Sequence, residues 1–462
     1  MPMPVKVPSA ETIRRYGVSG PRYTSYPTAL SFSPDVGEPE LRQAIGASND
    51  QLVPPNLTLY AHIPFCRSLC YYCGCHKKVT RNRAVVQRYL TALHRDICAR
   101  AAQIDDDRIV DQLHWGGGTP TYLNAGQRAS LMDCIGQAFR LSTESTRDFS
   151  IEIDPRTLPA SEVQGLADIG FNRISIGVQD FLPAVQAAVN REHSPQLVDE
   201  LMTAARDANF ASIGLDLIYG LPHQNVESFC ATLDTVVALQ PDTLSVFNYA
   251  HLPERFPAQR LLRADDMPDA QLRIAIFRET VSRLSAAGYE FIGMDHFALT
   301  DSPLAQARRD GKLHRNFQGY SVGAGNDTLG FGASAISQVG GSYFQSETEL
   351  PAYFDRVMAA AGPIMRGYVA TAEDRRVAHA IQDIMCHASF DKRAWGARFR
   401  ECADTFFAAE LQGLQALASD GLVVCGADRI DVTPKGLVFL RVVAQCFDRH
   451  SVRNDRRCSQ II

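Results

Sequence analysis

Short apolar and β-branched runs alternate with longer amphipathic runs from Leu57 onward. Each amphipathic run is long enough to cross a sheet and return the chain parallel to the preceding strand. Six such units in a row predict an α/β fold, a parallel sheet curved into a partial (β/α)6 barrel that stays open on one side. The predicted strands are Leu57–Ile63, Val110–Trp115, Phe149–Ile153, Arg173–Val178, Ile213–Tyr219 and Thr243–Tyr249. The predicted helices are Val85–Ala102, Gln127–Phe139, Ser161–Ile169, Pro195–Asn209, Val226–Leu239 and, closing the region, Asp269–Ala287.

The segments on either side of this region follow other patterns. Residues 1–54 carry no continuous period; Glu11–Tyr16 is the start of a helix and Pro21–Thr28 reads as an extended arm. Glycine-rich stretches at Tyr289–Ala298, Arg315–Tyr320 and Gly330–Ser337 predict loops over the open barrel face. We therefore expect three parts: an N-terminal arm (1–54), the barrel with its lid loops (55–345) and a mostly helical C-terminal domain (346–462).

The C-terminal domain has a pattern of its own. Ala372–His387 and Phe406–Ala418 are its clearest helices, Gly421–Val424 and Arg429–Val432 predict a small β-wing, and Thr433–Gly436 opens a last helix. A winged-helix shape often binds DNA, but no basic recognition helix is present, so a lid or docking role is favoured. The basic tail Arg449–Arg457 is expected to be disordered or peripheral.

Composition narrows the class of protein. The chain has 462 residues, of which 45% are hydrophobic and 21% charged, and its net charge is −5, which is ordinary for a globular protein and does not indicate a nucleic-acid or membrane partner. No apolar run reaches the ~18 residues that span a membrane, and the N-terminus lacks a signal core. Twelve cysteines are too sparse for a disulfide scaffold. We expect a cytoplasmic protein.

Four of the twelve cysteines fall within ten residues, directly after the first strand. Cys66, Cys70 and Cys73 are spaced C-x3-C-x2-C, and Cys75 follows. A zinc ribbon needs a second C-x2-C pair, and a ferredoxin needs four ligands at other spacings. Three cysteines in one loop suit a [4Fe–4S] cluster that leaves its fourth iron open to a small molecule.

Polar residues and glycines gather where the predicted strands end, which is where ligands bind in such folds. The second strand runs into Gly116-Gly117-Gly118, where backbone N–H groups could face a ligand. In the third strand Glu152 and Asp154 alternate with apolar residues, so both point into the barrel, where they need polar partners such as ribose hydroxyls. Asp216 is an acid within an apolar strand.

The cysteine loop resembles that of the radical SAM enzymes, whose cluster binds S-adenosylmethionine (SAM) at the open iron and cleaves it to a 5′-deoxyadenosyl radical. Further motifs resemble one family within this class, the oxygen-independent coproporphyrinogen III dehydrogenases of haem biosynthesis. The matching motifs are Arg22-Tyr23-Thr24-Ser25-Tyr26-Pro27, Cys73-Gly74-Cys75, Gly116-Gly117-Gly118-Thr119-Pro120-Thr121, Val189-Asn190-Arg191, Phe247-Asn248-Tyr249-Ala250-His251-Leu252-Pro253 and Arg315-Asn316-Phe317-Gln318-Gly319-Tyr320.

The resemblance implies the reaction and the cofactors. That family converts the propionates on rings A and B of coproporphyrinogen III to vinyl groups, giving protoporphyrinogen IX, and uses one [4Fe–4S] cluster and two SAM molecules. Cys66, Cys70 and Cys73 are the implied cluster ligands, whereas Cys75 is not. Contacts to the first SAM are implied for Tyr60, Tyr72, Gly117, Glu152 and Ile336. Contacts to the second are implied for Gly118, Thr119, Gln179, Arg191, Asp216 and Ala250.

Several partners follow from the same interpretation. A substrate with four carboxylates needs cations, and Arg22 and the run Lys77, Lys78 and Arg81 are the candidates, a solvated basic face being the alternative for the run. A reductant, an electron acceptor and a monomeric state are also expected. Two other classes stay open: a haem-binding radical SAM protein, which typically has an aromatic residue in place of Cys75 and lacks the arm, and an iron–sulfur electron carrier. For His62, His251 and His296 a buried, hydrogen-bonded role is favoured over proton transfer.

Overall fold

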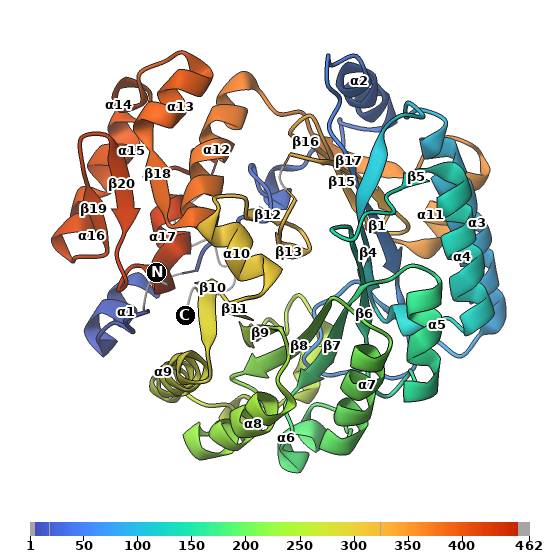
Figure 1. Cartoon of the computed structure of the whole chain (residues 1–462), viewed down its shortest axis with the longest axis horizontal. Coiled ribbons are helices and arrows are strands. Elements are labelled where there is room, and N and C mark those ends of the chain that lie inside the picture. The colour runs from blue at the N-terminus through green and yellow to red at the C-terminus, as the bar shows by residue number, and fades with distance from the viewer. Residues whose placement is uncertain (1–4, 18, 324, 451–462) are drawn as a thin grey trace.

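Six parallel strands form the centre of the molecule, as the sequence predicts. The computed structural model describes residues 5–17, 19–323 and 325–450. Its main sheet contains β1 (Leu57–Ile63), β4 (Ile109–Gly117), β6 (Asp148–Ile153), β7 (Arg173–Gln179), β8 (Ser212–Tyr219) and β9 (Thr243–Asn248), hydrogen-bonded in the order β9-β8-β7-β6-β4-β1. All five pairings are parallel. The helices between these strands cover the outer face of the curved sheet (Figure 1).

The crossover helices match the amphipathic runs to within a few residues. They are α3 (Arg83–Ala101), α4 (Ala125–Ala138), α5 (Val163–Asp168), α7 (Pro195–Asp207), α8 (Val226–Leu239) and the closing helix α9 (Ala270–Ala286), with a short α6 (Pro183–Ala188) before α7. Polar caps set where several of them begin: Asn124 accepts from the backbone of Gln127, and Asn225 from that of Ser228. Inside the barrel wall Trp115 packs edge-on against Phe171, with ring centroids 5.0 Å apart.

The expectation of loops after the sixth strand is wrong, because both edges of the sheet are extended there. At one edge β10 (Tyr289–Gly293) and β11 (His296–Leu299) join β9 in antiparallel pairing. At the other, β14 (Asp327–Phe331) pairs parallel with β1, and β15 (Ile336–Val339), β16 (Ser342–Ser346) and β17 (Ile364–Tyr368) follow it. These strands are short and interrupted by glycines, so their period-2 signal is weak.

Smaller elements complete the barrel region. These are the two-residue strands β2 (Phe65–Cys66), β3 (Lys78–Val79) and β5 (Arg140–Leu141), the hairpin β12 (His314–Asn316) and β13 (Gly319–Ser321), and the helices α10 (Pro303–Arg309) and α11 (Leu350–Met358). Before the barrel, α1 (Ala10–Tyr16) confirms the predicted helix start, whereas α2 (Glu38–Asn49) was not predicted. Only Leu41, Ile45 and two polar residues of α2 are buried, so its apolar stripe is too thin to recognise.

The C-terminal elements lie together at the upper left of Figure 1. They are α12 (Ala372–His387), α13 (Lys392–Phe399), α14 (Ala403–Phe406), α15 (Ala408–Gly413), α16 (Gln415–Ser419) and α17 (Leu440–Gln445), with β18 (Ser389–Asp391), β19 (Val423–Cys425) and β20 (Arg429–Val432) forming a small sheet. The wing is confirmed, with β18 as a third strand. The single helix Phe406–Ala418 is wrong: the chain leaves helical geometry at Phe407, whose fully buried ring packs on Phe390 and Trp395.

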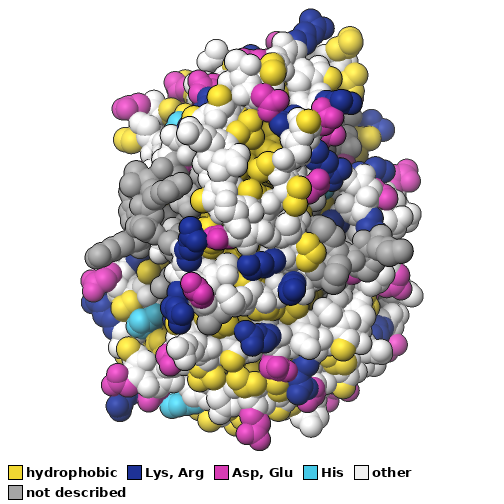
Figure 2. Space-filling model, turned by 90° about the vertical axis from the view of Figure 1, so that its left-hand side faces the viewer, with side chains coloured by type: hydrophobic (Ala, Val, Ile, Leu, Met, Phe, Trp, Pro, Cys, Tyr) yellow, Lys and Arg dark blue, Asp and Glu magenta, His cyan; other side chains and the backbone are white. Residues whose placement is uncertain are grey.

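Charges of both signs cover this part of the surface. Figure 2 shows the left-hand side of Figure 1, with basic and acidic side chains interspersed and hydrophobic ones between them. This distribution agrees with the absence of a basic recognition helix. Of the predicted basic tail, residues 451–457 lie outside the described residues, while Arg449 packs over Phe406 and pairs with Glu410 at 2.6 Å. No helix in the described ranges is both long and apolar enough to cross a membrane.

The arm Pro21–Thr28 has no regular structure and lies between the barrel and the C-terminal elements. Its main chain accepts hydrogen bonds from Arg441 at Pro21 (2.8 Å) and from Arg315 at Arg22 (3.1 Å). Tyr23, which is buried, donates to Asp448 at 3.0 Å, and the backbone of Tyr26 donates to Tyr343 at 3.2 Å. The arm therefore joins segments that are far apart in the sequence.

A buried ion pair joins the start of β14 to the chain before β4. Arg108, whose side chain is 1% exposed, donates to Asp327 at 2.7 Å, and Asp327 also accepts from the backbone of Gly340. Replacing Arg108 with Ala leaves the carboxylate buried and unpaired, and should lower the free energy of unfolding by about 3 to 5 kcal/mol. Urea unfolding followed by circular dichroism measures this loss. The exposed pair Arg283–Asp234 gives the control, since Arg283→Ala should cost less than about 1 kcal/mol.

Candidate active site

The cysteine loop leaves the C-terminal end of β1 and lines a cavity inside the barrel. Cys66 belongs to β2, which pairs with β3, while Cys70 and Cys73 follow in irregular backbone. The cavity has a volume of about 510 Å³, and all three thiols face it together with the ends of β4, β6, β7, β8 and β9. The strand ends and the cysteines thus converge as the sequence predicts.

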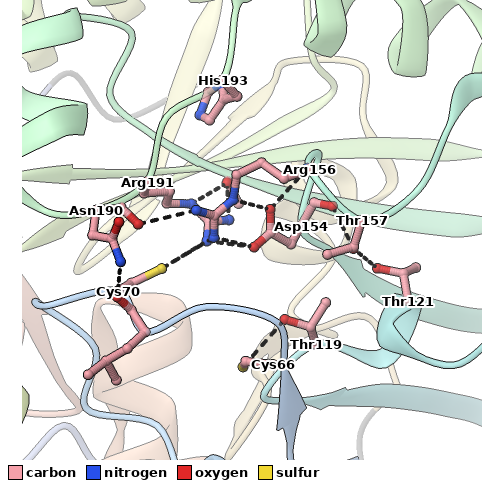
Figure 3. Close-up of polar contacts among 12 residues, drawn as sticks. Cys66, Cys70, Thr119, Thr121, Asp154, Arg156, Thr157, Asn190, Arg191 and His193 are labelled. Atoms are coloured by element: carbon pink, nitrogen blue, oxygen red, sulfur yellow. Dashed lines mark hydrogen bonds and ion pairs between the residues drawn. The ribbon is translucent and has the colours of Figure 1, made fainter. Parts of the chain in front are cut away.

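An ion-pair network holds the middle cysteine against the barrel (Figure 3). Asp154, at the end of β6, accepts from Arg156 at 2.7 Å and from Arg191 at 3.0 Å. The same two guanidinium groups approach the sulfur of Cys70, Arg156 at 3.4 Å and Arg191 at 3.5 Å. Burial alone would raise the pKa of Asp154, but the two arginines outweigh it and lower the pKa to about 2. Two fixed cations therefore face one thiol.

The other two thiols differ in their surroundings. Cys66 lies 3.6 Å from the hydroxyl of Thr119, and burial raises its pKa to about 11 despite that contact. The pKa of Cys73 is lowered, first by a hydrogen bond from Cys75 and then, against burial, by Lys77. Asn190, which follows helix α6, donates to the backbone carbonyl of Leu69 at 2.8 Å, so the loop between the cysteines is also tied to the segment after α6. The loop is therefore held both at the Cys70 sulfur and at the Leu69 carbonyl.

These three thiols suit a cluster better than a single ion. Among the described residues no group of three His, Cys, Asp or Glu side chains is placed to hold one metal ion. Each thiolate of a [4Fe–4S] cluster binds a different iron, so its sulfurs lie further apart than the ligands of one ion. The thiols of Cys66, Cys70 and Cys73 are close enough to interact electrostatically, and they share one cavity with cationic partners. The donor set therefore fits the cluster.

The glycine run plays a different part from the one predicted. Gly117 has φ +115°, and a Cβ there would lie 2.5 Å from the His62 ring; a Cβ on Gly118 would lie 2.6 Å from the backbone of Pro64. Their N–H groups are not free, since Gly117 donates to Glu152 at 3.2 Å and Gly118 to Ile63 at 2.9 Å. The expectation of bare N–H groups is wrong at these two positions. The glycines let β4 approach the cysteine loop closely.

Two more carboxylates of the cavity lie in contrasting environments. Burial would raise the pKa of Glu152, but hydrogen bonds from His114 and Gly117 lower it. Asp216 accepts from Ser175 at 3.0 Å, and burial, followed by the charge of Glu152, raises its pKa to about 6. The cavity therefore holds one carboxylate that stays ionised and one that titrates close to neutral pH.

Most of the predicted SAM contacts line this cavity. They are Tyr72, Gly117, Glu152, Gly118, Thr119, Gln179, Arg191, Asp216 and Ala250. Three predicted residues do not line it. Tyr60 stacks on His114 with ring centroids 5.8 Å apart, Ile336 belongs to β15, and Arg22 pairs with Asp295 and lies over the ring of Phe247, which lines the cavity. Their roles remain predictions from the resemblance alone.

Some residues that line the cavity were not predicted to do so from the sequence. Arg156 is the clearest, since it follows Asp154-Pro155 at a strand end and that position could have identified it. Gln318 and His296 also line the cavity, and each keeps a buried polar atom, Oε1 and Nδ1 respectively, without a partner among the described residues. His296 is the first residue of β11 and Gln318 lies between β12 and β13, strands that the sequence pattern did not reveal, so no signal placed either side chain in this cavity.

The three histidines His62, His251 and His296 differ in whether their ring nitrogens have hydrogen-bond partners. His62 contacts the Tyr60 hydroxyl and the His76 carbonyl, each at 3.0 Å, and burial lowers its pKa to about 4. His251 contacts the Tyr249 hydroxyl at 3.1 Å. Burial lowers the pKa of His296 to about 3, yet its Nδ1 lacks a partner among the described residues. The expected structural role thus fits His62 and His251 better than His296.

The basic run beside the cysteines is divided between inside and outside. Lys77 lines the cavity and donates to the Cys73 carbonyl at 3.0 Å. Lys78 and Arg81 are exposed and do not line it. A substrate in this cavity can therefore meet Lys77 but not the other two.

A curved parallel sheet with three cysteines in the loop after its first strand defines a radical SAM protein. Residues 60–236 match the model of the radical SAM superfamily. The chain is 46% identical to the oxygen-independent coproporphyrinogen III oxidase of Salmonella typhimurium (97% of this chain, 96% of the relative) and 44% identical to that of Escherichia coli at the same coverage. The solved coproporphyrinogen III oxidase of Escherichia coli matches with a TM-score of 0.92 and 42% identity, covering 97% of this chain and 100% of that one. The chain belongs to the oxygen-independent coproporphyrinogen III oxidase family.

The pKa values of Asp216 and Asp154 are shifted in opposite directions, and the pH dependence of stability tests this difference. Because its pKa is raised in the fold, Asp216 supports the folded state fully below about pH 4, and this support is lost as pH rises through about 6. Asp216→Asn should therefore raise the stability at pH 8 by about 2 kcal/mol and leave it nearly unchanged at pH 4. Anaerobic urea unfolding of the cluster-free protein at both pH values measures the difference.

Asp154 supplies the opposite case for the same experiment. Its lowered pKa means that its contribution is present at neutral pH and is lost only below about pH 4. Asp154→Asn should lower stability at pH 8 by about 3 kcal/mol, since Arg156 and Arg191 lose their partner. Equal effects of the two substitutions at pH 8 would contradict the charge states assigned here.

Proposed function

We propose that this protein converts two propionate side chains of coproporphyrinogen III to vinyl groups, giving protoporphyrinogen IX in haem biosynthesis. The main support is that three loop cysteines and the strand ends converge on one cavity. The chain is also similar over 97% of its length to proteins named coproporphyrinogen III oxidase. Each conversion removes one hydrogen atom, one CO2 and one electron from the substrate. The enzyme is a radical SAM oxidoreductase with a [4Fe–4S] cluster and SAM as cofactors.

When bound, the cluster and SAM supply a 5′-deoxyadenosyl radical that takes a hydrogen atom from the propionate β-carbon. The protein's part is to position the reactants and to exclude water. Cys66, Cys70 and Cys73 would hold the cluster. Arg156 and Arg191, held by Asp154, fix the Cys70 side of the loop through their contacts with its sulfur.

Two SAM molecules are proposed to share the cavity. The residues that match contacts to the first are Tyr60, Tyr72, Gly117, Glu152 and Ile336, and those that match the second are Gly118, Thr119, Gln179, Arg191, Asp216 and Ala250. Glu152 is supported as an ionised acceptor by its lowered pKa, which suits an amino or hydroxyl group. Tyr60 and Ile336 have the weakest support, because neither lines the cavity.

The substrate's carboxylates need cations near the cavity rim. Lys77 lines the cavity, and Arg22 is held by Asp295 over the face of the rim residue Phe247, at 5.6 Å from the ring centroid. The side chain of Arg22 is 34% exposed, so it keeps donors for a second carboxylate. This arrangement supports Arg22 as a propionate contact.

Further expectations concern the protein as a whole. We propose a cytoplasmic monomer in three parts, residues 1–54, 55–345 and 346–462, although β17 at Ile364–Tyr368 still belongs to the barrel sheet. Apart from the adjacent Leu52 and Val53, the exposed large hydrophobic residues lie on separate parts of the chain, for example Leu30, Val79, Met358 and Val424, which supports a monomer. A one-electron reductant and a final electron acceptor complete the reaction.

The first test is anaerobic turnover. Reconstituted protein with SAM, dithionite and coproporphyrinogen III should yield protoporphyrin after oxidation, with about two 5′-deoxyadenosines per product, as measured by chromatography. Cys73→Ser should abolish both products and the cluster absorbance, because a thiolate ligand is lost. Cys75→Ser should keep the cluster. Absence of both products from wild-type protein with an intact cluster would contradict the proposal and favour haem binding.

Arg22 is tested through substrate affinity. Arg22→Ala should raise KM for coproporphyrinogen III about tenfold with kcat little changed, since one charge-assisted hydrogen bond is lost. Steady-state kinetics over a range of substrate concentrations measures the change. Arg15→Ala, on the nearby helix α1 and paired with Asp420 at 2.9 Å, is the control. An unchanged KM would make the arm a structural strap only.

A further inference from the structure

The surface beside the cluster loop is basic in an acidic protein. Between residues 51 and 95 the chain carries seven Lys and Arg residues and no Asp or Glu, whereas its net charge is −5. Two of the seven are engaged with α11: Arg88 lies over Phe354 and near Asp355, and Arg95 contacts Met358. The remaining charges belong to the cluster loop and to the segment that leads from it into α3.

Three of these charges are exposed and unpaired. Arg67, Lys78 and Arg81 are exposed, and none of them makes an ion pair with a carboxylate among the described residues. Val79 lies between Lys78 and Arg81 and is itself 42% exposed, so an apolar side chain stands among these charges. An apolar centre with basic residues around it is typical of a surface that binds an acidic protein.

The start of α3 adds to the positive potential. Arg83 is the first residue of this 19-residue helix, and its first turn contains no acidic residue. A helix N-terminus carries partial positive charge and is stabilised by acids, so basic residues there cost stability. A merely solvated surface would not require that cost. The charges are therefore better explained by a partner than by solubility.

The basic surface lies one strand away from the first cluster cysteine. The main chain of Val79 is directly opposite Cys66 in the β2–β3 pair, and the N–H of Thr80 donates to the Cys66 carbonyl at 3.3 Å. Paired strands lie about 4.8 Å apart. Arg67 directly follows Cys66 at the end of β2, and Lys78 and Arg81 flank the residues paired with it, so the three charges lie close to this ligand along the chain.

We propose that Arg67, Lys78, Val79 and Arg81 form the docking surface for an acidic one-electron carrier protein that reduces the cluster. The inference rests on the proposed function, which requires a reductant. The reduced carrier gives up one electron and the oxidised cluster accepts it; no bond forms and no proton moves. The same surface explains why Lys78 and Arg81 point away from the substrate cavity.

The test uses the reconstituted holoenzyme and a small acidic FMN protein of the flavodoxin class as the probe. In the double variant Lys78→Glu/Arg81→Glu, the Kd for the probe should rise at least about tenfold, and its dependence on salt concentration should weaken. Anaerobic titration calorimetry measures the Kd, and stopped-flow absorbance measures probe-dependent reduction of the cluster, which should slow in proportion. The matched control is Arg140→Glu/Arg278→Glu, which reverses two exposed arginines on β5 and α9 and should leave both values unchanged.

The outcomes separate this inference from the proposed function. Turnover driven by dithionite should be the same in the variant and the wild type, because the two residues lie outside the cavity. An unchanged Kd, or equal binding of an acidic protein that has no redox cofactor, would overturn the docking surface. A loss of dithionite-driven turnover would also overturn it and assign the charges to the substrate. Failure of the wild type to convert coproporphyrinogen would instead contradict the function while leaving the binding result intact.

Discussion

The contact between two arginines, one aspartate and Cys70 is the interaction on which the site depends. Asp154 lies at the end of a central strand, and through Arg156 and Arg191 it places two cations against a sulfur in the neighbouring loop. Buried arginines need a fixed acidic partner, and Asp154 is that partner for both. This network also makes the position of the loop depend on three separate strand ends, because these residues follow β6, β7 and β1.

The close approach of β4 to this loop is the second constraint. Gly117 and Gly118 leave no room for a Cβ against His62 and Pro64, so the run of glycines serves packing first. The carboxylate of Glu152 is then held by the N–H of Gly117, which connects the packing of the backbone to the charge of the cavity. A residue near a ligand can thus be required by the protein's own architecture before any ligand is bound.

The six central strands and their helices could be predicted because each is long enough to show its period. The cysteine spacing and the inward carboxylates Glu152 and Asp154 could be predicted for the same reason: both depend on local order in the chain. The place of His296 and Gln318 in the cavity could not, since they lie in or beside short strands whose pairing depends on partners elsewhere in the sequence. Likewise, Lys77 lines the cavity and Lys78 does not because β3 begins at Lys78 and pairs with β2. The local sequence around these lysines does not show this pairing.

The N-terminal arm is synthesised well before the residues that it contacts. Its hydrogen bonds go to Arg315, Tyr343, Arg441 and Asp448. The contacts over more than 400 positions can form only after Arg441 and Asp448 have left the ribosome. The large loop between them and the arm therefore closes late in folding. Arg22 therefore reaches the rim of the cavity only in a finished molecule. A chain that stops short of Arg441 has the barrel but lacks the hydrogen bond that Arg441 donates to Pro21. Arg22 is then no longer fixed beside the cavity, so the site depends on a segment that is synthesised after the barrel.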